Sequence, residues 1–215
     1  MTTHGPLSAT AEKPRPAARA GAAPGSGAPA TEASGSAAPG AEAADSAAPG
    51  TRQAGRHFRR TAGRFPTGVT VVTTLDQGRP HGTTVNSFTT VSVDPCLVLV
   101  ALGQRSRLHD KILSSASFTV SVLSDTQEED ARWFADPARP AGAEAFTGRP
   151  WRAAPYSGAP ILLDGVAYFD CAVEETRGAG DHTLLVGRVE TFGVLRDGPA
   201  LTFADSAFTP RKGRL

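Results

Sequence analysis

Two runs rich in valine and threonine, separated by a short turn, constrain the fold of this chain more than any other feature. The runs Val69–Thr74 and Thr83–Val93 have the β-branched composition that fits a pleated, half-buried sheet surface. The connector at 76–80 contains Gly78, which tolerates unusual backbone angles, and Pro80, which blocks strand pairing. We therefore predict two neighbouring strands with a turn between them, and a fold built on β-sheet.

The second run carries small hydrogen-bonding side chains along most of its length. Short hydroxyls and amides on a rigid strand can donate to an anionic or heteroaromatic ligand without adding bulk. An ordinary threonine-rich strand is the competing interpretation, and composition alone does not separate the two. The side chains concerned are Thr83, Thr84, Asn86, Ser87, Thr89 and Thr90.

Length and charge limit the class of protein. The chain has 215 residues, 40% of them hydrophobic, and a formal net charge of +1, which is enough for one domain with a real core. The near-neutral balance gives no electrostatic reason to expect nucleic acid or an anionic membrane as partner, and no apolar run approaches membrane-spanning length. Cys96 and Cys171 form no CxxC pattern, so we expect no zinc site, two buried thiols and a reducing, cytoplasmic location.

The first 55 residues have a composition that argues against a packed core. Ala, Pro, Gly and Ser dominate the segment, no aromatic residue occurs in it, and the pentapeptide SAAPG appears at 36–40 and again at 46–50. Such a segment cannot bury enough apolar surface to offset its chain entropy. We predict a disordered extension at 1–55, acting as a tail or tether, and a folded domain at 56–215. A transit peptide is the competing interpretation, against which the acidic residues argue.

The rest of the chain alternates short strands with a few helices. Helices are predicted at 57–65, at 107–113 with Ser106 as N-cap, and at 126–134, with an irregular excursion at 136–160. The strand at 96–102 is expected to be buried on both faces, 118–123 to be half exposed, and 168–174 to point Asp170 outward. Further strands are predicted at 182–194 and 200–204, and the tail after Pro210 is expected to fray. About six strands with hairpin-like links indicate an antiparallel barrel with helical additions.

No hydrolytic constellation competes with a binding function. The chain lacks GxSxG and HExxH, and its five histidines are scattered. Asp181 and His182 are neighbours, and on a strand their side chains would point to opposite faces, so we expect no dyad between them. The carboxylates at 128–130 are interpreted as a solvated helix face.

Four segments in order resemble the short-chain flavin reductases of the FMN-binding split-barrel type, which are the reductase components of two-component flavin-dependent monooxygenases. The segments are FPTGVTVVTT (65–74), GTTVNSF (82–88), VSVDPCLVLV (91–100) and GDHTLLVGRVE (180–190), and the likeness runs from His57 to Phe208. The resemblance implies a mainly β split barrel with short flanking helices and a homodimer with flavin near its interface.

The polar strand is the first candidate site. Gly82 would let backbone approach a ligand closely, and the hydroxyls of Thr83 and Thr84 could hold phosphate without a formal charge. The resemblance places this strand against the flavin ring and its ribityl phosphate, with Asn86 and Ser87 at the polar edge of the ring.

A second candidate lies at the end of the strand predicted at 96–102. A glycine-containing loop that enters a helix capped by Ser106 is an anion site, and Arg107 adds a bidentate donor. The resemblance places flavin phosphate contacts here. The cofactor-binding residues of this group are Ala101, Leu102, Gly103, Ser106 and Arg107.

The third candidate is His182, which the resemblance places beside the nicotinamide and makes the catalytic residue. Near the C-terminus, the family carries a cluster of aromatic residues and glycines, of which this chain keeps only Phe203 and Phe208. Phe208 is therefore added to the predicted cofactor-binding residues.

The resemblance implies an NAD(P)H:flavin oxidoreductase that passes hydride from NADH or NADPH to FMN or FAD and supplies a partner monooxygenase. A flavin-binding barrel without hydride transfer, or an accessory subunit, is the alternative. The choice between FMN and FAD, and between NADH and NADPH, stays open at this point.

Overall fold

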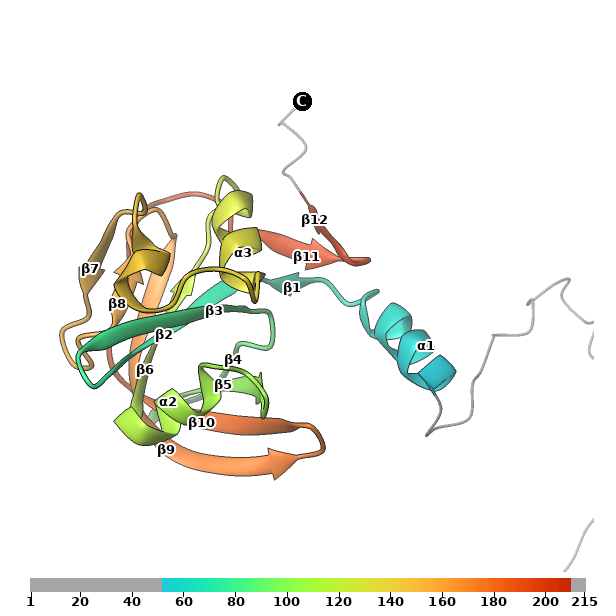
Figure 1. Ribbon diagram of the computed structural model, residues 1–215, viewed down its shortest axis with the longest axis horizontal. Coiled ribbons are helices and arrows are strands. Elements are labelled where there is room, and N and C mark those ends of the chain that lie inside the picture. Colours follow the sequence, from blue (N-terminus) through green and yellow to red (C-terminus); the bar gives the residue numbers. More distant parts are fainter. Residues whose placement is uncertain (1–51, 210–215) are drawn as a thin grey trace, which may run out of the picture. The chain divides into compact units, whose positions relative to one another are not determined.

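The computed structural model describes residues 52–209, which form a mainly β fold with one large sheet and two small ones (Figure 1). The large sheet has the order β3-β2-β6-β9-β10-β5-β4, and all its neighbouring strands run antiparallel. Its strands are β2 (Thr70–Asp76), β3 (Arg79–Val85), β4 (Thr89–Val93), β5 (Cys96–Gly103), β6 (Ser117–Val122), β9 (Ala167–Ala179) and β10 (His182–Val194).

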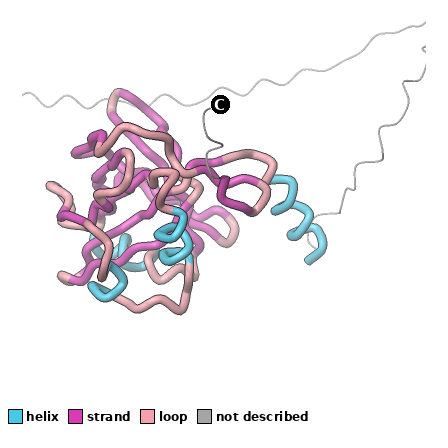
Figure 2. The backbone as a smooth tube through the Cα atoms, turned by 90° about the horizontal axis from the view of Figure 1, so that it is seen from above, coloured by secondary structure: helices cyan, strands magenta, loops and turns pink. Residues whose placement is uncertain are grey.

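The remaining elements are short, and strands outnumber helices in the trace (Figure 2). One small sheet joins β1 (Thr67–Gly68), β11 (Thr202–Ala204) and β12 (Ala207–Thr209), and the other pairs β7 (Trp151–Ala153) with β8 (Pro160–Leu162). The helices are α1 (Arg52–Ala62), α2 (His109–Ser115), α3 (Glu128–Ala135) and the 3₁₀ turn η1 (Gly142–Phe146). None of the helices within 52–209 is both long and apolar enough to cross a bilayer.

The large sheet curls on itself, as its connections show. Strands β3 and β4 form its two opposite edges, yet only residues 86–88 link them. The link covers four Cα–Cα steps from Val85 to Thr89 and spans at most about 14 Å, so the two edges must approach each other there. The hydroxyl of Ser87 fastens the link to β5, donating to the Ala101 carbonyl at 2.9 Å and accepting from the Ala101 amide at 3.0 Å. The predicted single strand at 83–93 is thus wrong, because it is broken where the barrel closes.

The predicted hairpin is present with a tighter turn than expected. Gln77 and Gly78 both have positive φ, 50° and 73°, which is the conformation of a two-residue hairpin loop. Pro80 lies inside β3 opposite Leu75 rather than blocking pairing. Since β3 is an edge strand, the missing N–H of proline is tolerated there.

Two large apolar clusters, and a smaller one around Ile161 and Tyr168, fill the interior of residues 52–209. The first lies inside the curled sheet around Phe118, Val100 and Leu185, and α2 covers it with Ile112. The second lies between β2, α3 and η1, where Phe134 and Phe146 pack with ring centroids 5.2 Å apart. Both clusters depend on the β-branched residues that the sequence placed in strands.

Several predictions of which side chains are exposed were wrong, because the two faces of the sheet are buried to different extents from one strand to the next. Strand β6 is buried over almost its whole length, and β5 alternates rather than being buried on both faces. Cys96 is exposed at the start of β5, whereas Cys171 is buried as predicted. Asp170 is fully buried, since it accepts the Tyr156 amide at 2.7 Å and the Thr119 hydroxyl at 3.0 Å.

The ends of the domain also differ from expectation. Helix α1 begins at Arg52, four residues before the predicted start of the folded domain, and the rest of the predicted 1–55 extension lies outside the described residues. The tail predicted to fray after Pro210 lies outside them as well. Phe58 and Phe65, the predicted apolar helix face, are exposed. Strand β10 spans 182–194, as predicted.

Candidate functional site

The polar side chains of β3 are tied into the protein. Thr83 donates to the Phe134 carbonyl at 3.3 Å, and Thr84 donates to the Ala131 carbonyl at 2.7 Å, so both hydroxyls hold α3 against the strand. Asn86 is exposed and donates to the Thr67 hydroxyl at 3.3 Å. These threonines therefore position the strand. A ligand could contact β3 at its unpaired edge and at the bend at Asn86.

Gly82 is tightly packed on the inner side of β3. A Cβ there would lie 3.2 Å from Thr73 Cγ2 and 3.3 Å from the rings of Phe134 and Phe146. The sequence predicted that Gly82 lets a ligand approach the backbone closely. Crowding on the inner side of the strand is a second reason for a glycine at this position. The Gly82 carbonyl accepts a hydrogen bond from the guanidinium of Arg139.

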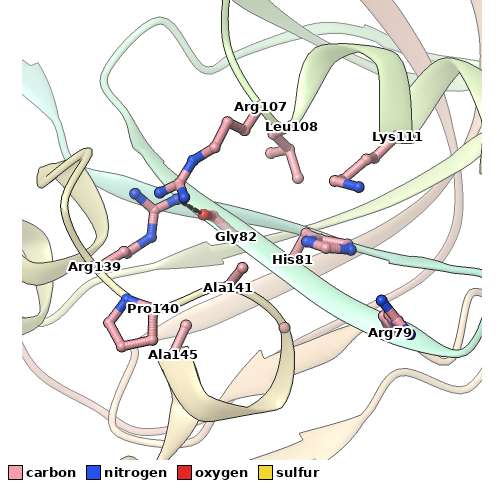
Figure 3. A pocket seen from close by; sticks show the side chains of 11 residues that line it. Arg79, His81, Gly82, Arg107, Leu108, Lys111, Arg139, Pro140, Ala141 and Ala145 are labelled. Carbon is pink, nitrogen blue, oxygen red and sulfur yellow. Dashed lines mark hydrogen bonds between the residues drawn. The ribbon is translucent and has the colours of Figure 1, made fainter.

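A pocket of about 220 Å³ opens beside Gly82 (Figure 3). Strand β3 supplies Arg79 and His81, and the turn before α2 and the helix itself supply Arg107 and Lys111. Arg139 enters from the segment before η1. All charged residues that line the pocket are cationic; the rest of its wall is Leu108, Pro140, Ala141, Gly142 and Ala145.

The charges in this pocket act on one another. Burial, and then the charge of Lys111, lowers the pKa of His81 below its ordinary 6.5. Burial, and then the charge of Arg107, lowers the pKa of Arg139. Asp76 lies 3.7 Å from the Lys111 ammonium and offsets part of the positive charge. The pocket is therefore a region of positive potential suited to anions.

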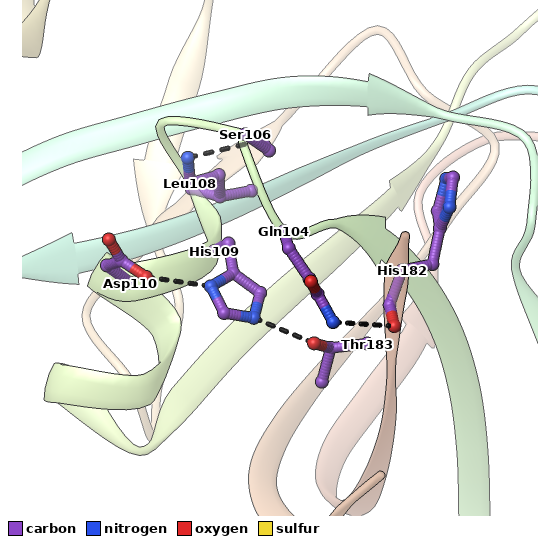
Figure 4. Close-up of polar contacts among 7 residues, drawn as sticks. All are labelled: Gln104, Ser106, Leu108, His109, Asp110, His182 and Thr183. Carbon is purple, nitrogen blue, oxygen red and sulfur yellow. Dashed lines mark hydrogen bonds and ion pairs between the residues drawn. The ribbon is translucent and has the colours of Figure 1, made fainter. Parts of the chain in front are cut away.

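The second and third predicted groups meet at the start of β10. Gly103 is paired with His182, and a Cβ on Gly103 would lie 3.9 Å from His182 Nε2. Gln104 ties the loop down, its amide donating to the Asp181 carbonyl at 3.0 Å and its side chain to the His182 carbonyl at 3.4 Å (Figure 4). Ala101 and Leu102 precede them on β5, and Leu102 is buried.

Asp181 and His182 do interact, contrary to the prediction. Oδ1 of Asp181 lies 2.7 Å from Nδ1 of His182, because Asp181 belongs to the turn and not to the strand, so the alternation of faces does not apply. The hydrogen bond to His182 lowers the pKa of Asp181. The imidazole is about half exposed, and its Nδ1 faces the carboxylate.

Ser106 does not cap α2. The helix begins at His109 after Leu108, and the Ser106 hydroxyl accepts the Leu108 amide at 3.3 Å within the preceding turn. Since α2 has only seven residues, its dipole adds little to the site. The anion-binding capacity of this region therefore depends on Arg107 and its cationic neighbours.

Phe208 is separate from these groups. It lies on β12, its ring 5.2 Å from that of Phe203 and 5.0 Å from the Arg132 guanidinium, and it packs against the second apolar cluster. The described residues do not bring it to the pocket.

Sequence reasoning missed four residues that line the pocket beside Arg107, namely Arg79, His81, Lys111 and Arg139, and it missed the buried His109. Arg79 and His81 are two apart on β3, a spacing that places both side chains on one face, whereas Lys111 lies on α2 and Arg107 lies in the turn before it. Arg139 comes from an irregular segment that carries no periodic signal. His109 is buried between Asp110 at 2.7 Å and the Thr183 hydroxyl at 2.9 Å (Figure 4). Within 52–209 no cluster of acidic, cysteine or histidine side chains could hold a metal ion.

Comparisons with known proteins agree with this architecture. The family model described as "Flavin reductase like domain" matches residues 62–211. The NADH-dependent FAD reductase of Streptomyces globisporus is 44% identical over 133 residues, which cover 62% of this chain and 72% of that protein. An NADH-dependent flavin reductase of a Rhodococcus species is 39% identical over 155 residues, 71% of this chain and 84% of the relative.

Solved structures show the same fold. The NADH:FAD oxidoreductase of Streptomyces globisporus C-1027 superposes with a TM-score of 0.71 at 36% identity, covering 78% of this chain and 99% of the other. The flavin reductase component of a bacterial two-component tryptophan halogenase gives 0.70 at 36% identity, covering 74% and 99%. The predicted split-barrel class is confirmed, and the chain belongs to the flavin reductase family.

Proposed function

We propose that this chain is an NAD(P)H:flavin oxidoreductase that reduces FMN or FAD for a partner monooxygenase. One observation supports the proposal: segments 79–87 and 101–107 approach each other at two places. Ser87 is hydrogen-bonded to Ala101, and Arg107 lines a cationic pocket together with Gly82 and His81. We infer that a flavin nucleotide would lie along these two segments, with its phosphate at the cationic pocket.

The residues present fit such a ligand. A bound flavin supplies the acceptor for hydride from the nicotinamide, a step that needs aligned rings and no protein acid or base. Arg107 would neutralise the flavin phosphate, and the bend held by Ser87 would present Asn86 to the polar edge of the ring. The imidazole of His182 is about half exposed, so it could contact the nicotinamide while its hydrogen bond to Asp181 holds its orientation.

The relatives support the nucleotide and the partner. Several are named as NADH-dependent, and one from Rhodococcus jostii, 36% identical over 156 residues, is named as the reductase subunit of a flavin-dependent monooxygenase. We propose the same class of partner here. Cys96 and Cys171 are both free thiols, which supports a reducing, cytoplasmic location.

A homodimer is part of the proposal. Strands β4 and β10 expose an apolar face at Val91, Val93, Phe192 and Val194. A groove lined by Cys96, Phe169 and Phe192, among others, lies in this face. Exposed apolar area of this kind in a soluble enzyme marks an interface, and a second copy of the same face would cover it.

The proposal is tested by NADH and NADPH oxidation with and without added FMN or FAD. We expect turnover that depends on flavin, and a large loss of kcat/KM for the nicotinamide nucleotide in His182→Ala with flavin binding retained. If flavin binds but no combination of nicotinamide nucleotide and flavin gives turnover, the chain is instead a flavin-binding barrel without reductase activity.

A further inference from the structure

We propose that the arginine face of α1, formed by Arg56, Arg59 and Arg60, attracts anionic nucleotides toward the His182 turn and so speeds their association with the site. The ligands concerned are the flavin and nicotinamide nucleotides, all of which carry phosphate groups. The inference rests on the proposed function, because it concerns how the substrates of that function reach the site and not which residues hold them there.

The charges on α1 are all positive. The helix contains no aspartate or glutamate, and Arg56, Arg59 and Arg60 are exposed and three or four residues apart, which places them on one helix face. Arg64, just after the helix, is paired with Asp205 at 3.4 Å. In the part of the chain that the structure describes, the other three arginines have no ion pair. The arginine face therefore keeps its charge.

The end of α1 is anchored beside the bend where the flavin ring is proposed to bind. The carbonyl of Gly63 accepts the Asp205 amide at 2.7 Å, which fixes the end of the helix. The hydroxyl of Thr67 accepts the side-chain amide of Asn86 at 3.3 Å. From Ala62, the last residue of α1, the five steps to Thr67 span at most about 18 Å. The helix therefore ends within that distance of the bend.

The charge of α1 also acts on the His182 turn. The hydrogen bond with His182 lowers the pKa of Asp181 most, and the charge of Arg59 adds a smaller lowering. Figure 1 accordingly shows α1 on the same side of the domain as the closed end of the β9–β10 hairpin. Since Asp181 is exposed and negative, it would repel a phosphate that approaches the turn, and Arg59 offsets this repulsion.

Charges at the mouth of a site act mainly on the rate of encounter, because they raise the local concentration of an oppositely charged ligand. Salt screens such an effect, since the Debye length falls to about 10 Å at 0.1 M ionic strength. The effect depends on charge and not on the shape of the guanidinium group. A site that grips phosphate in a bidentate manner would instead distinguish arginine from lysine.

The test measures association of FMN by stopped-flow fluorescence in the double variant Arg59→Gln/Arg60→Gln. The control is Arg152→Gln/Arg196→Gln, which removes the same net charge from exposed positions outside α1, and Figure 1 shows β7, the strand of Arg152, on the opposite side of the domain. At about 10 mM salt we expect the association rate constant to fall about threefold to tenfold in the α1 variant and less than about 1.5-fold in the control. The difference should disappear near about 0.5 M salt.

Two further measurements exclude a structural cause. Riboflavin, which has the same ring and no phosphate, should associate with all variants at the wild-type rate. Arg59→Lys/Arg60→Lys keeps the charge and should keep the rate for FMN. Circular dichroism and thermal melts establish that the variants are folded.

An unchanged rate for FMN, an equal fall for riboflavin, an equal fall in the control, or no rescue by lysine would each overturn the inference. The association rate is measured without NADH, so the proposed function is tested separately. If FMN associates with the expected dependence on charge and salt but no nicotinamide nucleotide is oxidised, the proposed function is overturned and the role of the arginine face stands.

Discussion

Nε2 of His109 lies 2.9 Å from the Thr183 hydroxyl, so that a buried histidine on α2 is joined to β10 one residue after His182. Nδ1 of the same ring lies 2.7 Å from Asp110. The arrangement resembles a catalytic triad in outline, yet Thr183 is buried. It instead connects the helix that follows Arg107 to the start of β10, where His182 lies.

Replacing His109 with Ala should loosen that connection. The buried Thr183 hydroxyl loses its partner, which we expect to cost about 1–3 kcal/mol of unfolding free energy. The KM for NADH should rise about fivefold while flavin affinity is retained, since only the His182 turn is displaced. Chemical denaturation and steady-state kinetics measure the two effects.

Two matched variants control this prediction. His109→Gln keeps an amide that can reach Thr183 and should restore most of the NADH KM, whereas a purely structural loss would not be rescued. Asp110→Asn changes the exposed partner and should leave stability within about 0.5 kcal/mol of wild type. Equal kinetics for His109→Ala and wild type would contradict the positioning role.

Gly82→Ala should destabilise the fold. The added methyl would press on Phe134, Phe146 and Thr73 at 3.2–3.3 Å, and overpacking of this kind costs about 1–3 kcal/mol. Thermal unfolding measures it. Gly55→Ala is the control, because a Cβ there meets no atom within 4 Å and the residue lies in α1, where alanine favours the helix. Equal melting temperatures for the two variants would show that β3 moves freely away from the aromatic pair.

Local patterns in the sequence predicted where most strands lie along the chain and which segments form the site. They did not predict contacts between residues from distant segments. Strand β10 was predicted at its observed bounds because a long strand can be recognised from neighbouring residues alone. Asp170 was placed outward because its partners, Thr119 and Tyr156, are 51 and 14 residues away. Arg139 was missed for the same reason, since only the folded chain brings it to Gly82.

Phe192→Glu should convert a dimer into monomers. In the proposed interface this ring is buried against a second copy, and a carboxylate there would lose its hydration without gaining a partner. Light scattering after gel filtration measures the mass. Leu163→Glu is the control, because Leu163 is also partly exposed but lies outside the groove. A wild-type chain that is already monomeric at all concentrations would exclude the interface.

Thiol labelling gives an independent measure of the same face. Burial raises the pKa of Cys171, so this thiol should stay unlabelled until the protein unfolds. Cys96 lines the groove on the proposed interface and should be protected in the dimer but labelled in Phe192→Glu. Mass spectrometry after brief alkylation measures both sites, and rapid labelling of Cys96 in the wild-type dimer would place the interface elsewhere.

Asp181→Asn should weaken nicotinamide use without affecting flavin binding. The pKa of Asp181 is lowered by its hydrogen bond with His182, so the carboxylate favours the folded state above the ordinary aspartate pKa of 3.8, and that contribution is lost as the pH falls through the lowered value. At neutral pH the pair is therefore intact, and the amide, which carries no charge, should hold the imidazole less firmly. We expect kcat/KM for NADH to fall about threefold to tenfold, with the Kd for flavin unchanged. Asp197→Asn, another exposed aspartate, is the control. An unchanged kcat/KM in Asp181→Asn, together with a large loss in His182→Ala, would show that the imidazole acts without the orientation its neighbour provides.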